Sequence, residues 1–225
     1  MSDTMKAMIS STAIDLPDHR KQVVDACIRL GVLPIGMEQL PARDASGVQV
    51  SLEMVDKADI YIGIYAWRYG WVPDVPGVPN PNKISITEME FNRALERKQS
   101  GEIKEILIFV MHDDHPIRAR DKEDGTEAQD KLRKFKDRAS THRVRLTFTS
   151  PEELRTLVVH SLSEALKRIK EAEAKPAEPA VPAPIQRRWR NECGKGAASL
   201  VRAAAFDMSS DLSRLRPGGR VHGEP

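Results

Sequence analysis

The strongest constraint on the fold is a regular alternation between short apolar runs and segments with helical periodicity. Runs with the character of β-strands cover residues 6–9, 33–37, 59–65, 105–110 and 143–148. Each run precedes a segment whose apolar residues recur every three or four positions, which indicates an amphipathic helix. The run at 59–65 shows little polar alternation and is typical of a central strand buried on both faces. The chain therefore alternates strand and helix five times.

Residues at the ends of the helical segments favour helix starts and stops. The first helix is expected from about Pro17 to Leu30, because Pro suits a first turn and Gly31 follows the end. The last helix begins at a capping box that Ser150 and Glu153 form. The faces expected to be buried carry Val23, Val24, Cys27, Ile28 and Leu30 in the first helix, Val48, Leu52 and Val55 in a second over residues 47–57, and Ala128, Leu132, Phe135 and Ala139 in the fourth. A third helix is expected from residue 86 to about residue 98.

This order of elements favours a doubly wound parallel sheet, because crossovers between parallel strands are right-handed. We therefore predict an α/β fold of the flavodoxin-like kind, with five parallel strands in the order 2-1-3-4-5. Such folds bind ligands at the carboxyl edge of the sheet, at the point where the strand order reverses. With this order, the crevice lies between the first and third strands.

The composition changes sharply near residue 172, which divides the chain into three parts. Residues 1–171 hold the α/β domain, and residues 172–185 read as a semi-rigid linker rich in Pro and Ala. Residues 186–225 are rich in Arg and lack a sustained pattern, so we expect this tail to be mostly disordered. A hydrophobic content of 40% agrees with a chain that is only partly core.

Charge and cysteine usage narrow the class of protein. Lys and Arg total 35 against 33 Asp and Glu, a net charge of +2. A dedicated nucleic-acid binder normally has a clear basic excess, so only the Arg-rich tail is a candidate for contact with nucleic acid or an acidic membrane surface. Cys27 and Cys193 are too few for a disulfide scaffold or a Cys-rich zinc site. No apolar run reaches 18 residues, and we expect a soluble, cytoplasmic protein without a transmembrane segment.

Two loops flank the predicted crevice. The first carries three small hydroxyl residues that can hold a phosphate or a ribose, Ser10, Ser11 and Thr12. The second, residues 66–71, combines the Arg68 guanidinium with aromatic rings that include Tyr69. A guanidinium fork, aromatic faces and hydroxyls together suit a nucleotide, which offers anionic phosphates, a ribose diol and a stackable base.

Two acids stand near the start of the third helix, and the sequence predicts different roles for them. Ser85 and Glu88 have capping-box spacing, so the Glu88 carboxylate can reach back to the Ser85 N–H. No such structural role accounts for Glu90. We expect Glu90 to enter the crevice from the first turn, where the helix dipole keeps it ionised, and Glu38 to approach from the second strand. An ionised carboxylate beside a sugar C1′ can attack it or stabilise oxocarbenium character.

Structural interpretations of the same residues stay open. The Ser10–Thr12 segment can simply turn the chain, and Trp67, Tyr69 and Trp71 can pack the long loop onto the sheet. Arg68 can pair with a structural acid such as Glu38 or Glu90.

Two further interpretations concern the acidic and histidine-containing positions. Glu90 itself can be a solvated helix residue that only serves the dipole. The segment His112–His115 contains two His and two Asp, but adjacent residues on one loop do not define a metal geometry, so we predict no metal site.

Four motifs in order resemble the bacterial domain-of-unknown-function family 4062, and the resemblance covers about residues 5–170. They are Ile9 to Thr12 with Asp15, Leu16 and Arg20; Pro34 to Glu38; Ala58-Asp59 with Arg68 to Gly70; and Ser85 to Glu90 with Ala94. That family is a TIR-like domain, often at the N-terminus of NTPases of the STAND type. It is similar to nucleoside 2-deoxyribosyltransferases, whose Thr-x-x-Glu-x-x-x-Ala run matches Thr87, Glu90 and Ala94.

The resemblance implies a function as well as a fold. Glu90 would be the catalytic carboxylate, with Thr87 and the two loops as ligand-binding residues. The substrate would be NAD or a related nucleotide, cut or transferred at its N-glycosidic bond without a required cofactor. The alternative is a non-catalytic module that binds a nucleotide or associates with itself, in signalling or phage defence.

Overall fold

The computed structural model describes residues 4–36, 46–74, 79–123, 125–141 and 145–174. All of them belong to one compact unit, Met1–Glu178. Glu38, the expected disorder of residues 186–225 and most of the linker lie outside the described residues, so the predicted division into domains stays a prediction. Within the described part, no helix is both long and apolar enough to cross a lipid bilayer.

Within these residues, five parallel strands form one sheet in the order β2-β1-β3-β4-β5, which confirms the flavodoxin-like prediction. The strands are β1 Lys6–Ser10, β2 Leu33–Ile35, β3 Ile60–Tyr65, β4 Glu105–Met111 and β5 Arg145–Phe148. Strand β3 is buried over its whole length, as expected for the centre of the sheet. Ser10 pairs in register with Gly63, so the end of β1 lies beside β3 at the predicted crevice.

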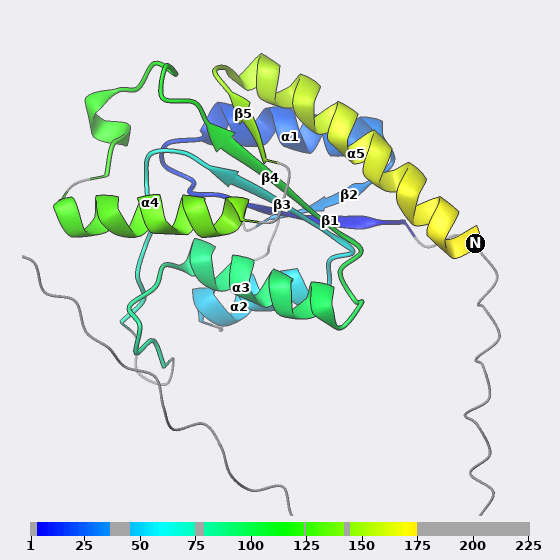
Figure 1. Cartoon of the computed structure of the whole chain (residues 1–225), viewed down its shortest axis with the longest axis horizontal. Helices are drawn as coiled ribbons and strands as arrows, with labels where there is room; N and C mark the ends of the chain where they lie inside the picture. Colours follow the sequence, from blue (N-terminus) through cyan, green and yellow to red (C-terminus); the bar gives the residue numbers. More distant parts are fainter. Residues whose placement is uncertain (1–3, 37–45, 75–78, 124, 142–144, 175–225) are drawn as a thin grey trace, which may run out of the picture. The chain divides into compact units, whose positions relative to one another are not determined.

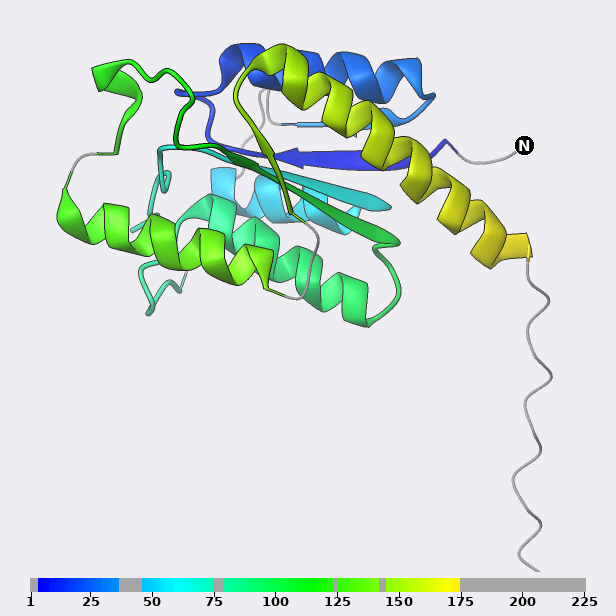
Figure 2. The ribbon, with the colours of Figure 1, turned by 45° about the horizontal axis from the view of Figure 1, so that its top comes forward.

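Helices cover both faces of the sheet (Figures 1 and 2). Helices α1 (Pro17–Arg29) and α5 (Pro151–Ala174) lie on one face. Helices α2 (Gly47–Asp56), α3 (Ile86–Gln99) and α4 (Thr126–Ser140) lie on the other. A short 3-10 helix, η2 (Ala119–Asp121), stands in the connection from β4 to α4. The right-handed crossovers expected from the alternating order produce this doubly wound arrangement.

The two faces of the central strand enter two apolar cores. Ile60, Ile62 and Ile64 pack with α1 and α5, whereas Tyr61 and Tyr65 pack with α2, α3 and α4. Alternate residues of a strand point to opposite faces, so one short segment supplies both cores. Burial of these side chains fixes β3, and with it the loop that follows at the carboxyl edge.

Two helix faces differ from the sequence prediction. Ile28 is 62% exposed, because it lies about 140° around α1 from the buried Val23. The buried stripe of α1 contains Ala26 and Cys27 beside Val23. In α2, Leu52 is only half-buried, whereas Ser51 is 1% exposed. A polar residue therefore occupies a position on the buried face of α2, and its partner lies in the candidate site.

Candidate functional site

A cavity of about 540 Å³ opens at the carboxyl edge between β1 and β3, where the reversal of strand order predicted a site. Its walls come from the loops behind β1 and β3 and from α2 and α3. Of the residues proposed from the sequence, those that line it are Ser11, Thr12, Arg68, Thr87 and Glu90. Of the remaining three, Ser10 lies behind Glu90, Tyr69 is buried away from the cavity lining, and Glu38 is outside the described residues.

Glu90 forms part of the cavity floor and is held by two serine hydroxyls. Ser10, at the end of β1, donates a hydrogen bond to Oε2 of Glu90. Ser51, on α2, donates to Oε1. The Glu90 residue is only 5% exposed. Its carboxylate therefore has a fixed orientation, set by one donor from the sheet and one from the neighbouring helix.

The electrostatics of Glu90 differ from the sequence prediction. Burial raises the pKa of Glu90, and the hydrogen bonds from Ser10 and Ser51 and the charge of Arg20 offset this only in part. Helix α3 begins at Ile86, so Glu90 lies in the second turn, where the helix dipole has little effect. The prediction that Glu90 lies in the first turn, within reach of the helix dipole, was wrong, and so was its interpretation as a solvated residue.

The loop behind β1 is braced by its own polar contacts. The Arg20 guanidinium donates to Oγ of Ser11 at 2.6 Å. The Thr12 hydroxyl donates to the Asp15 carboxylate, which also accepts from the backbone N–H of Trp67 at 3.4 Å. Ser11 and Thr12 thus hold the loop in shape and line the cavity as well, so the turn-forming and ligand-facing interpretations are compatible.

Glu88 has a structural role, but a larger one than capping. The Ser85 hydroxyl accepts from the Glu88 backbone N–H at 3.3 Å, which is half of the predicted capping box. The Glu88 carboxylate instead accepts from the hydroxyl of Tyr69 and from the guanidinium of Arg138. Burial, followed by the hydrogen bond to Glu88, raises the pKa of Tyr69. Glu88 therefore ties α3 to the loop behind β3 and to α4.

Arg68 lies at the rim of the cavity and pairs with an acid that the sequence did not single out. Its guanidinium lies 3.9 Å from the carboxylate of Glu123 and donates to the carbonyl of Arg120 at 3.2 Å. Glu123 also accepts from the backbone N–H of Tyr69 at 2.6 Å. The suggested ion pair with Glu90 is wrong, because Glu123 takes that place.

Of the aromatic residues in the loop behind β3, two pack against the apolar cores and one is exposed. Trp67 and Tyr69 pack against the two cores, in agreement with the structural interpretation. Trp71 is 58% exposed and lines the cavity together with Ile14, which is 68% exposed. The rim of the cavity therefore offers an aromatic face and an aliphatic side chain to an incoming molecule.

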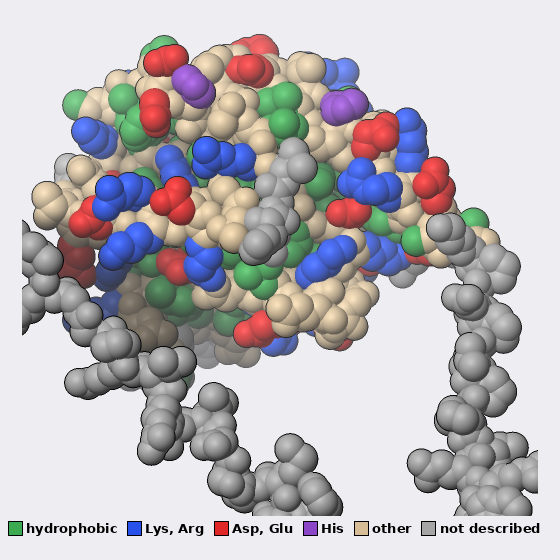
Figure 3. All heavy atoms as spheres, viewed as in Figure 1, with side chains coloured by type: hydrophobic (Ala, Val, Ile, Leu, Met, Phe, Trp, Pro, Cys, Tyr) green, Lys and Arg blue, Asp and Glu red, His purple; other side chains and the backbone are tan. Residues whose placement is uncertain are grey.

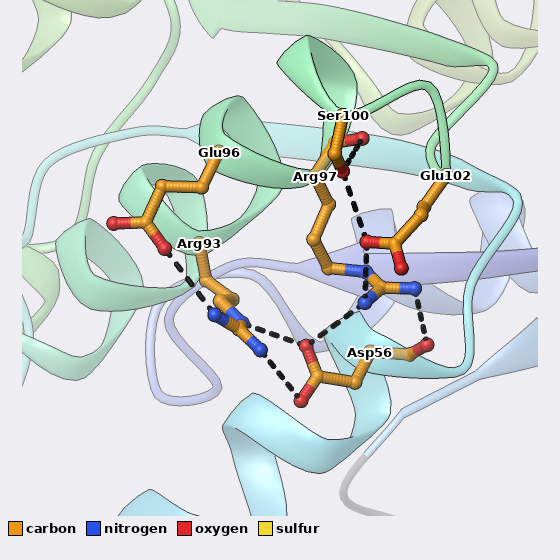
Figure 4. A network of polar contacts seen from close by, with 6 residues as sticks. All are labelled: Asp56, Arg93, Glu96, Arg97, Ser100 and Glu102. Atoms are coloured by element: carbon orange, nitrogen blue, oxygen red, sulfur yellow. Dashed lines mark hydrogen bonds and ion pairs between the residues drawn. The ribbon is translucent and has the colours of Figure 1, made fainter.

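An ion-pair network joins α2 to α3, the two helices that carry Ser51 and Glu90 (Figure 4). Arg93 donates to both carboxylate oxygens of Asp56, at 2.7 and 3.2 Å, and Arg97 donates to the Asp56 carbonyl at 2.7 Å. This clamp holds the helix that carries Ser51 against the helix that carries Glu90. Ser51 was not predicted from the sequence, where the only signal was a small polar residue between the apolar positions of an amphipathic helix.

The His112–His115 segment contributes one contact of interest. Nε2 of His115 lies 3.1 Å from Nε2 of His19 on α1. Among the described residues, no group of three or more His, Cys, Asp or Glu side chains has an arrangement that could hold a metal ion.

Comparisons with known proteins identify the family. No curated protein matches the chain significantly. Among solved structures, the chain is similar to the TIR domains of the activated Roq1 resistosome that recognises the effector XopQ, with 12% identity, a TM-score of 0.40 and coverage of 76% of this chain and 99% of that one. It is also similar to general stress protein 14 of Treponema denticola in complex with FMN, with 15% identity, a TM-score of 0.31 and coverage of 75% and 98%. The model of one family matches residues 6–163, and the chain therefore belongs to the family described as Domain of unknown function (DUF4062).

Proposed function

We propose that this domain cleaves or transfers at the N-glycosidic bond of NAD or a related nucleotide, with Glu90 as the catalytic carboxylate. The observation that carries the proposal is the position of Glu90, buried on the floor of a cavity at the carboxyl edge and oriented by Ser10 and Ser51. Clefts of about 300–1,000 Å³ are typical of small-molecule sites, and this cavity falls within that range.

The burial of Glu90 supports this chemistry on electrostatic grounds. When the bond between C1′ and the base breaks, its electron pair leaves with the base and positive charge develops at C1′. A carboxylate in a poorly solvated site interacts strongly with that charge, since little water screens it. The interaction strengthens as positive charge gathers at C1′ in the transition state, so it lowers the barrier to the reaction. Water then adds to C1′ and loses a proton, or an acceptor hydroxyl does so in a transfer.

The rest of the cavity supports a nucleotide ligand. The hydroxyls of Ser11 and Thr87 can hydrogen-bond to a ribose, and the Arg68 guanidinium at the rim can meet a phosphate. The exposed ring of Trp71 offers a surface on which a base can stack. These roles extend the expectation from sequence and stay proposals.

The experiment is a turnover assay on purified protein with NAD, NADP and a set of nucleosides, with released base measured by chromatography. Glu90→Gln should lower the rate of base release at least about a hundredfold, as expected for a group that acts directly on the reacting bond. Glu96→Gln, on the same helix but exposed, serves as the control and should retain activity. Equal turnover by wild type and Glu90→Gln would overturn the proposal.

One observation favours a second function, a non-catalytic module that binds a nucleotide or associates with itself in signalling or defence. Both oxygens of Glu90 already accept hydrogen bonds from serine hydroxyls, which is also what a purely structural carboxylate would do. In that case, titration calorimetry would detect nucleotide binding, or light scattering would detect self-association, while no base is released by any variant.

A further inference from the structure

A second cleft, separate from the Glu90 cavity, lies between α4 and the strands β4 and β5 and has a volume of about 730 Å³. It shares no lining residue with the Glu90 cavity. The two are divided where the Glu123 backbone N–H donates to the Trp67 carbonyl at 3.1 Å. Trp67 and Lys122 line the second cleft, whereas Arg68 and Glu123 line the first. Neighbouring residues on two joined loops therefore face two different hollows.

Cationic side chains outnumber acids in the lining of the second cleft. The ionised groups there are Lys122, Arg133, Lys136, Arg145, Asp113 and Asp137. Figure 3, which views this side of the molecule, shows Lys and Arg side chains gathered around α4. The lining therefore carries two more cations than acids. Arg133 also pairs with Asp130 outside the lining at 2.9 Å, so one positive charge is left over, and a ligand with negative charge would neutralise it.

Two donors on residues that line the cleft have no acceptor among the residues that the structure describes. Nε1 of Trp67 is buried and has no hydrogen-bond partner within the described ranges of the chain. The ammonium of Lys136 lies 5.4 Å from the centre of the Trp67 ring, and no hydrogen bond or ion pair joins it to another residue that the structure describes. Burial lowers the pKa of Lys136, and the charges of Asp113 and Asp15 offset this only in part. Donors that are removed from water without acceptors are costly, so an anion that accepts from them would be stabilised here.

We propose that this second cleft binds a small ligand with two or more phosphate groups, through Lys136, Trp67 and the arginines of α4 and β5. Phosphate oxygens only accept hydrogen bonds, which matches an indole N–H, an ammonium and two guanidinium groups that only donate. A ligand with more than one phosphate can contact Lys136 and the two arginines at once, whereas a single carboxylate reaches fewer of these cations. The cleft stands at the carboxyl edge beside β4 and β5, where α/β sheets accept ligands. This site is independent of the function proposed for Glu90.

The test is titration calorimetry of the full chain with inorganic pyrophosphate and with ADP. Wild type should bind one equivalent of pyrophosphate, and the affinity should fall as salt is raised because the contacts are ionic. Lys136→Met should weaken binding at least about tenfold, the effect of losing one charge-assisted contact. Lys134→Met removes the same charge from an exposed position of the same helix outside the cleft, and should bind within about twofold of wild type.

Further variants and ligands separate a specific site from a general basic surface. Glu90→Gln should bind pyrophosphate as wild type does, which distinguishes failure of this proposal from failure of the catalytic one. If circular dichroism shows that Lys136→Met does not fold, Arg145→Gln replaces it, because Arg145 is exposed on the edge strand. This variant should also weaken pyrophosphate binding at least about tenfold. Equal binding by wild type and the cleft variants would overturn the proposal. So would an equal loss in Lys134→Met, or tighter binding of a single-stranded oligonucleotide than of pyrophosphate, since both indicate a general basic surface.

Discussion

The Ser51 hydroxyl on α2 donates a hydrogen bond to Oε1 of Glu90 on α3, across 39 positions of sequence. Ser10 donates to the other oxygen from the end of β1. The orientation of this carboxylate therefore depends on how two helices and a strand pack together, and not on α3 alone. The clamp of Asp56 with Arg93 and Arg97 holds the two helices in the arrangement that this hydrogen bond requires.

Removal of the Ser51 hydroxyl should affect both stability and the state of Glu90. We expect Ser51→Ala to lower the free energy of unfolding by about 2 kcal/mol, the usual cost of losing a hydrogen bond to a buried charged group. Because this hydrogen bond lowers the pKa of Glu90, the variant should also shift the pH profile of any Glu90-dependent activity to higher pH. Urea denaturation and rate measurements across pH test this.

The control is Ser46→Ala at the start of the same helix, where the serine side chain makes no capping hydrogen bond. It should change stability little. If Ser51→Ala proves as mild as Ser46→Ala in both measurements, Ser51 does not position Glu90.

Replacement of Glu90 should change the pH dependence of stability. The folded pKa of Glu90 is raised above its unfolded value by burial, so its contribution to stability is fully present below the unfolded pKa and is lost as pH rises through the folded pKa. Glu90→Gln keeps a neutral side chain of the same size at every pH. We expect this variant to gain stability relative to wild type as pH rises above about 4.5. Denaturation at a series of pH values measures the difference, and a difference that is constant across pH would contradict it.

Gly70 lines the Glu90 cavity. We expect it to be intolerant of a side chain, because of its backbone conformation and its close neighbours. Its φ is +92°, and an added Cβ would lie 3.1 Å from Cγ2 of Thr12 and 3.4 Å from Oγ1 of Thr87. Gly70→Ala should lower the free energy of unfolding by about 1–3 kcal/mol through backbone strain and crowding. It should also weaken ligand binding in the cavity.

The matched control for Gly70 is Gly101→Ala. Gly101 has a φ of +82°, but apart from its chain neighbours no described residue has an atom within 4 Å of its added Cβ, so this change reports backbone strain alone. Thermal unfolding of both variants separates strain from crowding, and an equal loss in the two would exclude crowding against Thr12 and Thr87.

His19 should make the fold sensitive to acid. Burial, and then the neighbouring His115, lowers the pKa of His19 from 6.5 to about 4. A depressed folded pKa means that the contribution to stability is present above pH 6.5 and is lost as pH falls through the folded value. The expected loss between these pH values is at most about 3 kcal/mol.

Comparison of variants isolates this effect. His19→Phe should lose less stability than wild type between pH 6.5 and pH 4, because its ring does not ionise. His160→Gln, at an exposed position on α5, should follow wild type. The same acid sensitivity in His19→Phe and wild type would show that other groups cause it.

The fold could be predicted because its determinants are local in sequence. Strand β3 is apolar on both faces and its burial is complete, as its pattern indicates. The start of α5 at Pro151 follows from the cap at Ser150, whose hydroxyl accepts from the Glu153 backbone N–H at 3.1 Å. Ile28 shows the limit of a periodic pattern: an apolar residue near the edge of a helical stripe does not reveal whether a neighbour covers it.

The candidate site was only partly predictable because its contacts join distant segments. Glu90 was singled out because Ser85 already accounts for Glu88, and the structure places Glu88 in contacts with Tyr69 and Arg138. The catalytic role of Glu90 stays a prediction. The sequence could not reveal that Ser51 bonds to Glu90 or that Glu123 pairs with Arg68. No sequence spacing relates residues that lie on different helices and loops of the fold.

The sequence by itself determined the order of strands and helices, the edge at which the cavity lies, and the helix that brings an acid to that edge. These depend on periodicity, capping and chain direction, which neighbouring residues specify. Only the tertiary structure decided that Glu90 is desolvated in the second turn of α3 and held by Ser10 and Ser51. Desolvation and hydrogen bonding depend on which surfaces meet in space, so the charge of Glu90 is a property of the packed domain and not of its helix.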